Sequence, residues 1–475
     1  MKVFFFLSVF FLSSFGFSQN SDLSERLDAY MSQMNEKGLS ASVICVKDGS
    51  VLLKKGYGFS NQEDKVLNTS TTVSTVGSIT KQFTAAAIMK LVSQGKISVD
   101  MTLGSVFQNV PADKANITVH QLLCMSAGFV EALGDDYDKM DRTTFLESAL
   151  KSKLLFEPGT SYHYSNVNYS ILGAIVEIFS GKDYETYCRE NLWLPAGMKN
   201  TGYVQPKWDL KQIAIGYNKR GENTGTSLDK LWDTNGPFWN LKCNGGVLST
   251  CEDMFKWYTA LQGEDILDEK MKSIMYSPSV AEDPEGHSHY GYGWSIVLTQ
   301  RETRLITHNG GNGIFFADYL NYEDENTFVY VASNASKKGM QDVAWELGRM
   351  MLIPGYEPEI RQYDPVPVTL KDIQNEDYIA TISNLIGFME GRDKSTNKEF
   401  IQANLGPGLL ESLPMKEHLE LFTQIRKTLD GARYQDMLEA GNEFYLNFEL
   451  FDGTRKQLFV ELNDMGKIRG IGLPD

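Results

Sequence analysis

The chain has 475 residues, of which 42% are hydrophobic and 22% are charged, an ordinary composition for a globular protein. Its formal net charge of −16, with no basic stripe in the sequence, argues against a nucleic acid or an anionic membrane as partner. The length predicts two or three domains.

The first residues have the features of a secretory signal peptide. Lys2 supplies a positive charge, residues 3–12 are apolar, and the small residues Gly16 and Ser18 have the spacing of a cleavage site. An uncleaved anchor is the alternative, but the apolar run is short for a membrane span. We therefore expect a signal peptide over residues 1–18, no membrane span in the mature chain, and an exported protein that is periplasmic or secreted.

The cysteines do not form a metal-binding or redox pattern. There are five, so at least one thiol is free, and neither a Cys-x-x-Cys nor a Cys/His metal spacing occurs. Cys45, Cys124 and Cys188 lie in apolar stretches that are typical of a core. A disulfide between Cys243 and Cys251 stays open as the less favoured alternative. We expect no metal and no cofactor.

The first predicted elements are a helix, a hairpin and a second helix. Residues 24–35 have the periodicity of an amphipathic helix. Residues 41–46 and 51–55 are predicted strands, joined by turn-forming residues. A β-branched run then reaches Gly77, and an apolar, alanine-rich helix follows from Ser78 until Gly95.

Ser78 and Lys81 are three residues apart at the start of that helix, so their side chains lie on the same face. A serine hydroxyl becomes a good nucleophile when a neighbouring group removes its proton. Apolar surroundings disfavour a charged lysine, and a fall in its pKa of about 3 units would make it a base near neutral pH. The spacing alone is not specific, because it recurs elsewhere in polar stretches, and a serine that only caps the helix is the alternative.

Two further motifs lie later in the chain. A loop over residues 156–166 contains Tyr164 and Asn166, which a turn could bring together, and a helix over 167–180 follows and ends at Gly181. Strands are predicted over residues 291–297, 304–307, 315–320 and 327–333, with a closing helix over 341–352. Glycines that follow His308 at a strand end indicate close approach by a ligand or another backbone.

A proline-rich, acidic stretch at residues 354–369 predicts a linker. Beyond it we expect a helix over 415–429 and a small antiparallel meander. The four strands of the meander are predicted at residues 433–437, 443–450, 457–462 and 468–471.

Three motifs in this order resemble those of the serine β-lactamases and penicillin-binding proteins. They are Ser78-Ile79-Thr80-Lys81, Tyr164-Ser165-Asn166 and His308-Asn309-Gly310. The tyrosine in the second motif is similar to that of the class C branch and its esterase and D-peptidase relatives. The resemblance runs from about residue 24 to residue 352 and includes the flanking stretches 117–128, 192–198 and 244–250.

The resemblance implies an α+β, β-lactamase-like fold: a five-stranded antiparallel sheet flanked by helices, plus a helical lobe, with the site between them. We accordingly expect a hydrolase domain over residues 21–353 and, after the linker at 354–369, a small accessory α+β domain over 370–475.

The resemblance also implies roles for the motif residues. Ser78 would be the nucleophile that forms an acyl-enzyme, and Lys81 and Tyr164 would share the acid–base work, with the group that takes the serine proton left open. Asn166 would orient Lys81 and the substrate amide. Backbone N–H groups of Ser78 and Gly311 would form the oxyanion hole.

The third motif departs from the family pattern, in which Lys-Thr-Gly favours a substrate carboxylate. His308 is mostly neutral at pH 7, so recognition of a carboxylate by charge is weakened, although Asn309 can still donate a hydrogen bond. Gly310 is kept. A purely structural, buried His308 is the alternative.

The sequence therefore favours a serine hydrolase that acts on an ester or an amide, such as a D-amino-acid peptide, a β-lactam or a small ester. The main alternative is a non-hydrolytic penicillin- or peptide-binding or sensor protein that uses the same cleft. A third possibility is a carbohydrate- or peptide-binding role in the C-terminal module. The natural substrate and the oligomeric state stay open.

Overall fold

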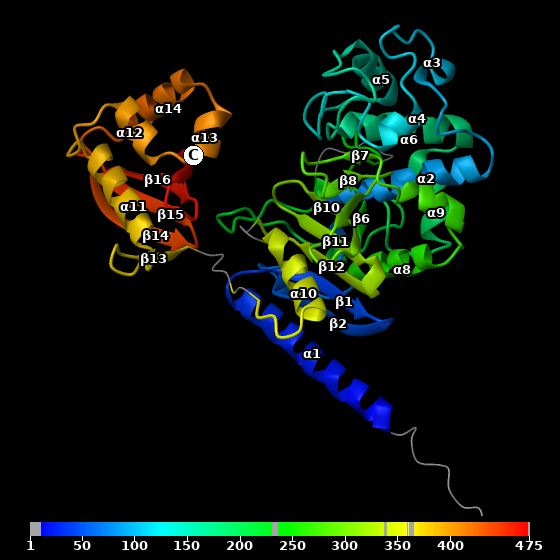
Figure 1. Ribbon diagram of the computed structural model, residues 1–475, viewed down its shortest axis with the longest axis horizontal. Coiled ribbons are helices and arrows are strands. Elements are labelled where there is room, and N and C mark those ends of the chain that lie inside the picture. The colour runs from blue at the N-terminus through cyan, green and yellow to red at the C-terminus, as the bar shows by residue number, and fades with distance from the viewer. Residues whose placement is uncertain (1–10, 230–235, 337–339, 359, 361–364, 474–475) are drawn as a thin grey trace, which may run out of the picture. The chain divides into compact units, whose positions relative to one another are not determined.

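The computed structural model describes residues 11–229, 236–336, 340–358, 360 and 365–473. The chain divides into two compact units, Met1–Ile360 and Arg361–Asp475. Each unit combines helices with an antiparallel sheet (Figure 1).

The first unit is built on an eight-stranded antiparallel sheet with the order β2-β1-β12-β11-β10-β9-β8-β7. In that order the strands are Ser50–Tyr57, Ala41–Lys47, Thr327–Ser333, Phe316–Tyr322, Arg304–Gly311, Ser295–Leu298, Ser288–Tyr290 and Val280–Ala281. The expected α+β class is confirmed. The implied number of five strands counts only the long ones, because three short strands extend the edge beyond β10.

Helices cover both faces of this sheet. The α-helices of this unit are α1 Phe11–Glu36, α2 Thr80–Ser93, α3 Leu103–Val106, α4 Val119–Leu123, α5 Arg142–Lys151, α6 Asn166–Ser180, α7 Tyr184–Cys188, α8 Cys251–Gln262, α9 Glu269–Met275 and α10 Val343–Leu352. Tyr258 of α8 stacks on Phe328 of β12, whereas Gly348 of α10 lies against Tyr322 of β11. Phe328 pairs with Asn321, the neighbour of Tyr322, so α8 and α10 lie on opposite faces.

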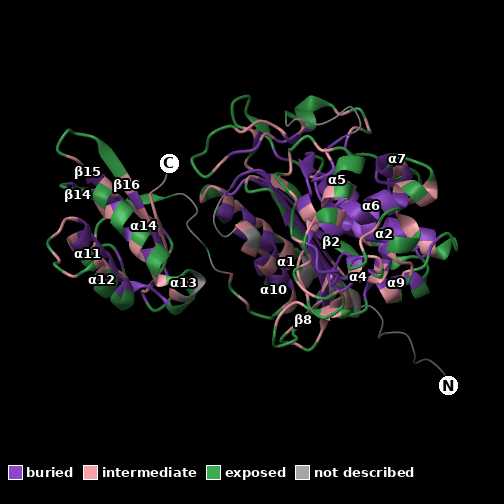
Figure 2. Ribbon diagram, turned by 90° about the horizontal axis from the view of Figure 1, so that it is seen from above, coloured by how far each residue is buried: buried purple, intermediate pink, exposed green. Residues whose placement is uncertain are grey.

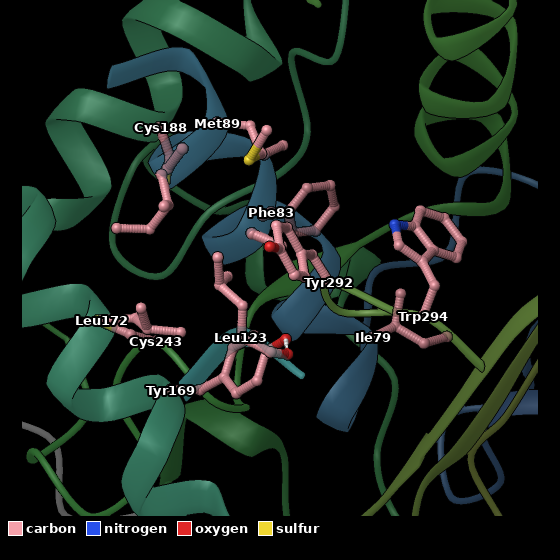
Figure 3. Packing of buried hydrophobic residues seen from close by; sticks show 14 of the residues in the cluster. Ile79, Phe83, Met89, Leu123, Tyr169, Leu172, Cys188, Cys243, Tyr292 and Trp294 are labelled. Atoms are coloured by element: carbon pink, nitrogen blue, oxygen red, sulfur yellow. Dashed lines mark hydrogen bonds between the residues drawn. The ribbon is translucent and has the colours of Figure 1, made fainter. Parts of the chain in front are cut away.

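Helix α2 is buried along almost its whole length at the centre of the helical lobe (Figures 2 and 3). The ring of Phe83 makes edge contacts with Trp193 and Trp257 at centroid distances of 5.6 and 5.0 Å. A Cβ at Gly293, which has a φ of +79°, would lie only 2.7 Å from the carbonyl oxygen of Lys81. Residues 291–294 therefore form a turn against α2, and the prediction that the strand starts at residue 291 is wrong, since β9 begins at Ser295.

The start of the chain differs from the predicted helix. Helix α1 begins at Phe11 instead of residue 24, so it includes the end of the predicted signal segment, while residues 1–10 lie outside the described residues. Within the described ranges, no helix combines the length and the apolar character that crossing a bilayer requires. All five cysteines are buried and free, so Cys243 and Cys251 do not pair.

The remaining short strands form two pairs, β3 with β4 and β5 with β6. Their bounds are Phe59–Asn61, Val66–Leu67, Ser74–Thr75 and Leu248–Ser249.

The second unit packs helices on its own five-stranded sheet, with the order β13-β14-β15-β16-β17. The strands are Val366–Val368, Arg433–Ala440, Glu443–Glu449, Arg455–Leu462 and Ile468–Gly472, and the helices are α11 Glu376–Met389, α12 Asn397–Asn404, α13 Pro407–Ser412 and α14 Met415–Thr428. The rings of Phe388 and Phe400 stack at 4.0 Å within its core. The meander was expected, whereas α11, α12 and α13 were not, and β13 lies inside the stretch that was expected to be a linker.

Phe83→Ala should destabilise the protein strongly, because it removes the ring that fills the space between two buried tryptophans. We expect a loss of about 3–5 kcal/mol in the free energy of unfolding, measured by chemical denaturation. Val51→Ala, at a side chain that is 47% exposed, is the matched control and should change it by less than about 0.5 kcal/mol. Equal losses in the two variants would contradict a central role for α2.

Candidate active site

Ser78 lies in a short 3-10 turn, Gly77–Ile79, that precedes α2, so it is not yet in the helix as the sequence predicted. The turn is tied to the segment before β6. The Val76 N–H donates to the Val247 carbonyl at 2.9 Å, and the Val247 N–H donates to Thr80 Oγ1 at 3.2 Å. Thr80 Oγ1 in turn donates to the Gly77 carbonyl at 2.7 Å. These bonds fix the backbone on both sides of the Ser78 hydroxyl.

The end of β10 packs against this turn backbone to backbone. A Cβ at Gly77, whose φ is +53°, would lie 2.5 Å from the Gly311 nitrogen. A Cβ at Gly310 would lie 2.1 Å from the Val76 carbonyl oxygen and 2.6 Å from the Ser78 nitrogen. Only glycine fits at these two positions, and the contact brings Gly311 and Ser78 to the same pocket.

Lys81 is fully buried, and its Nζ lies among three oxygens. The distances are 3.1 Å to Ser78 Oγ, 2.7 Å to Asn166 Oδ1 and 2.9 Å to the Asn244 carbonyl oxygen. Burial lowers the pKa of Lys81 to about 7, although the negative charge of Asp136 acts in the opposite direction. The amine is therefore substantially uncharged near neutral pH.

The contacts of the uncharged amine have only one consistent arrangement. Asn166 Oδ1 and the Asn244 carbonyl can only accept, so they take both hydrogens of a neutral –NH2 group. Its lone pair then remains for the hydroxyl hydrogen of Ser78. The three contacts orient the lysine as a base toward the serine.

Tyr164 and Asn166 are brought to the site by the start of α6. Between them Ser165 caps the helix, and its hydroxyl also donates to the Val130 carbonyl at 2.8 Å. The Tyr164 ring centroid lies 4.6 Å from Lys81 Nζ, and its phenol hydrogen-bonds with Ser78. Burial raises the pKa of Tyr164, so the phenol keeps its proton at neutral pH.

His308 is buried and held on both ring nitrogens. Nδ1 lies 2.6 Å from the Asn309 carbonyl oxygen, and Nε2 lies 3.0 Å from the Tyr290 hydroxyl. Because a carbonyl can only accept, Nδ1 carries the hydrogen and Nε2 accepts from Tyr290. Burial and the charge of Lys81 lower the pKa of His308 to about 3, so the ring is uncharged at neutral pH.

The predicted site residues line two pockets that flank the Ser78–Tyr164 pair. The first, of about 60 Å³, is lined by Ser78, Asn166 and Gly311. The second, of about 340 Å³, is lined by Tyr164, His308 and Asn309. Gly310 contacts the nucleophile turn itself. The structure thus brings all eight predicted site residues into one region.

Sequence reasoning did not identify three residues that take part in the site. Asn244 supplies a carbonyl to Lys81, Tyr290 holds His308, and Asp136 lines the first pocket. The stretch 244–250 already carried the family resemblance, so it offered a signal for Asn244. Asp136 and Tyr290 act through the three-dimensional fold, and no local pattern marks them.

A family model described as Beta-lactamase matches residues 27–349. The chain belongs to the beta-lactamase family. Among its curated relatives is Protein flp of Staphylococcus aureus (strain MW2), 25% identical over 382 residues that cover 76% of this chain and 72% of that protein. The family assignment confirms the resemblance seen in the motifs and supports a serine hydrolase type of activity.

Solved structures agree with this fold. A penicillin-binding protein from Bacillus halodurans is 26% identical, with a TM-score of 0.59 over 68% of this chain and 98% of that one. The octameric penicillin-binding protein homologue from Pyrococcus abyssi is 21% identical, with a TM-score of 0.62 over 95% of this chain and 99% of that one. At 21% identity, the Pyrococcus abyssi structure shows only that the fold is shared.

Gly310→Ala should displace the nucleophile turn, because the added methyl group meets backbone atoms that cannot rotate away. We expect the rate of covalent labelling by a fluorophosphonate to fall about 10²-fold, the cost of a misplaced reacting group. Gly387→Ala in α11, where a Cβ meets open space, is the matched control and should label at the parental rate. Parental labelling of Gly310→Ala would mean that this backbone contact does not position the nucleophile.

Proposed function

We propose that this protein is an exported serine hydrolase that cleaves an ester or an amide through an acyl-enzyme on Ser78. The observation that carries the proposal is the 3.1 Å contact between Ser78 Oγ and the buried amine of Lys81. An amine with a pKa of about 7 is a competent general base at neutral pH.

In the acylation step Ser78 Oγ attacks the substrate carbonyl carbon, and the hydroxyl proton passes to Lys81 Nζ. The proton goes to the lysine because Tyr164, with its raised pKa, is still a neutral phenol and cannot accept it. The carbonyl oxygen becomes an oxyanion that the N–H groups of Ser78 and Gly311 stabilise. Each such donor contributes roughly 10²–10³ in rate.

The tetrahedral intermediate then loses its leaving group. Tyr164 donates its phenol proton to the departing nitrogen or oxygen, and Lys81, whose Nζ lies 4.6 Å from the ring centroid, passes the proton it took from Ser78 to the tyrosine oxygen. The products are the acyl ester of Ser78 and the protonated leaving group. In deacylation the neutral amine of Lys81 takes a proton from a water molecule, whose oxygen attacks the acyl carbon of the ester. The same proton then passes from Lys81 to Ser78 Oγ, so the acid product leaves and the serine hydroxyl is restored.

The uncharged state of His308 affects which substrates the site can recognise by charge. A neutral ring whose nitrogens are both engaged offers no positive charge to a substrate carboxylate. This favours esters and amides without a carboxylate at that position over β-lactams and D-alanyl peptides.

The remaining parts of the chain take supporting roles in this proposal. Residues 1–18 direct export and are removed, and residues 21–353 form the hydrolase domain. After a linker that starts at residue 354 and ends before β13, residues 370–475 form an accessory domain together with β13. A separate domain is favoured because the second unit has a core of its own.

Incubation with a fluorophosphonate should add one adduct to the intact protein, because Ser78 is an activated nucleophile, and mass spectrometry measures it. Ser78→Ala should remove the adduct and all turnover. Ser105→Ala, at a hydroxyl bonded only locally, is the control and should label normally. Persistent labelling of Ser78→Ala would remove this serine from the mechanism. No label on the parental protein would favour the binding-protein alternative.

The pH dependence of kcat/KM should report the titration of Lys81. Protonation of its amine blocks proton removal from Ser78, so activity should be low in acid and rise through about pH 7. His308 does not contribute, because its pKa of about 3 leaves it uncharged throughout this window. Lys81→Arg, which keeps a positive charge at every accessible pH, should be inactive. A profile that stays flat between about pH 5 and about pH 9 would contradict lysine as the base.

A further inference from the structure

Asp136 is a feature of the pocket beside Ser78 that the mechanism above does not use. It lines the same pocket as Ser78 and Asn166, and its charge acts on Lys81. Its side chain is half-buried. Within the part of the chain that the structure describes, the carboxylate makes no hydrogen bond and no ion pair.

The loop that carries Asp136 is tied down on both sides of it. The Asn166 N–H donates to the Glu131 carbonyl at 2.9 Å, and Asn240 Nδ2 donates to the Asp135 carbonyl at 2.9 Å. The Asp135 N–H donates to the Asp138 carboxylate at 2.9 Å. Asp136 is therefore held at the pocket by its neighbours, although its own carboxylate is not engaged by any of them.

Among the described residues, no other charged group around the site pairs with Asp136. No Arg or Lys is among the described residues that line either pocket. Glu282, in the second pocket, differs from Asp136, because its carboxylate accepts from the hydroxyls of Tyr162, Ser288 and Ser295. The first pocket therefore holds, beside the nucleophile, a carboxylate that could accept hydrogen bonds from a ligand.

We propose that Asp136 binds a cationic nitrogen of the substrate, so that the preferred ester or amide carries an ammonium group a short distance from the scissile carbonyl. Amino acid amides and the N-terminal residues of short peptides have this chemistry. The inference rests on the proposed function, since it assigns the substrate class of the same Ser78 site. It makes Asp136 a specificity-determining residue for that reaction.

Two properties of the pocket agree with a small ammonium group. The Tyr137 side chain hydrogen-bonds with Asn312, and both residues line a space of only about 60 Å³. Burial and the charge of Asp135 raise the pKa of Asp136, because both destabilise its ionised carboxylate. A bound ammonium group would stabilise the ionised carboxylate by forming a charge-assisted hydrogen bond with it.

The test uses three p-nitrophenyl esters of equal length, those of β-alanine, butyric acid and succinic acid. They end in an ammonium, a methyl and a carboxylate group, and each kcat/KM is divided by the rate of hydrolysis by hydroxide. We expect the β-alanine ester to exceed the butyrate ester by about tenfold, which corresponds to about 1.4 kcal/mol, and the succinate ester to be the slowest.

Three variants assign the preference to the carboxylate. Asp136→Asn should bring the ratio of β-alanine to butyrate ester close to one, and Asp136→Glu should keep it above one. Glu131→Gln is the matched control, since it removes a nearby, exposed charge that does not line the pocket and keeps the backbone carbonyl that accepts from Asn166, and it should keep the parental ratio. Because only ratios are compared, a loss of folded protein in one variant does not change the outcome.

A parental ratio near one, or an unchanged ratio in Asp136→Asn, would overturn the inference. If butyrate hydrolysis is then still lost in Ser78→Ala, the serine hydrolase proposal stands without it. If the parental protein hydrolyses none of the esters, or if Ser78→Ala hydrolyses them equally well, the proposed function itself fails and the inference falls with it.

Discussion

The site depends on a lysine amine that is completely buried and that, within the described part of the chain, forms no ion pair with a carboxylate. A charged amine in such a place is costly, because burial removes its water and the oxygens that hydrogen-bond with it are uncharged. The oxygens come from segments far apart in the chain, Asn166 at the start of α6 and Asn244 in the turn before β6. Helix α2 must place Lys81 Nζ within hydrogen-bonding distance of both oxygens. The position of this lysine therefore constrains how the helices around α2 pack on the sheet.

A second constraint is the space between the nucleophile turn and the end of β10. β9 begins at Ser295, opposite Thr307, so the last residues of β10 extend past the pairing with β9 toward the turn. Gly77 and Gly310 let the two backbones approach more closely than any side chain would allow. Backbone atoms cannot move by changing a side-chain rotamer. These contacts therefore hold the N–H groups in fixed positions, and the groups need little reorganisation during the reaction. Side chains such as Tyr164 and His308 then complete the cleft around this rigid centre.

Local patterns in the sequence predicted the parts of the site that local geometry controls. The spacing of Ser78 and Lys81 predicted their contact, and Gly181 predicted the end of α6. The catalytic roles assigned to these residues stay predictions. Asp136 and Tyr290 could not be found in this way, because they reach the site only through tertiary packing, whereas the stretch 244–250 offered a signal for Asn244. The strand expected from residue 291 was wrong for the same reason, since Gly293 packs on α2 instead of continuing β9.

The five cysteines are all buried thiols, and none is joined to another. Burial raises the pKa of Cys45, Cys188 and Cys251, so their reactive thiolate forms are scarce, and oxidants or alkylating agents meet poor nucleophiles. Folding then requires no disulfide to form or rearrange, and the redox potential of the surroundings does not select among folded forms. The chain can reach the same set of covalent links in a reducing cytoplasm as in an oxidising exterior.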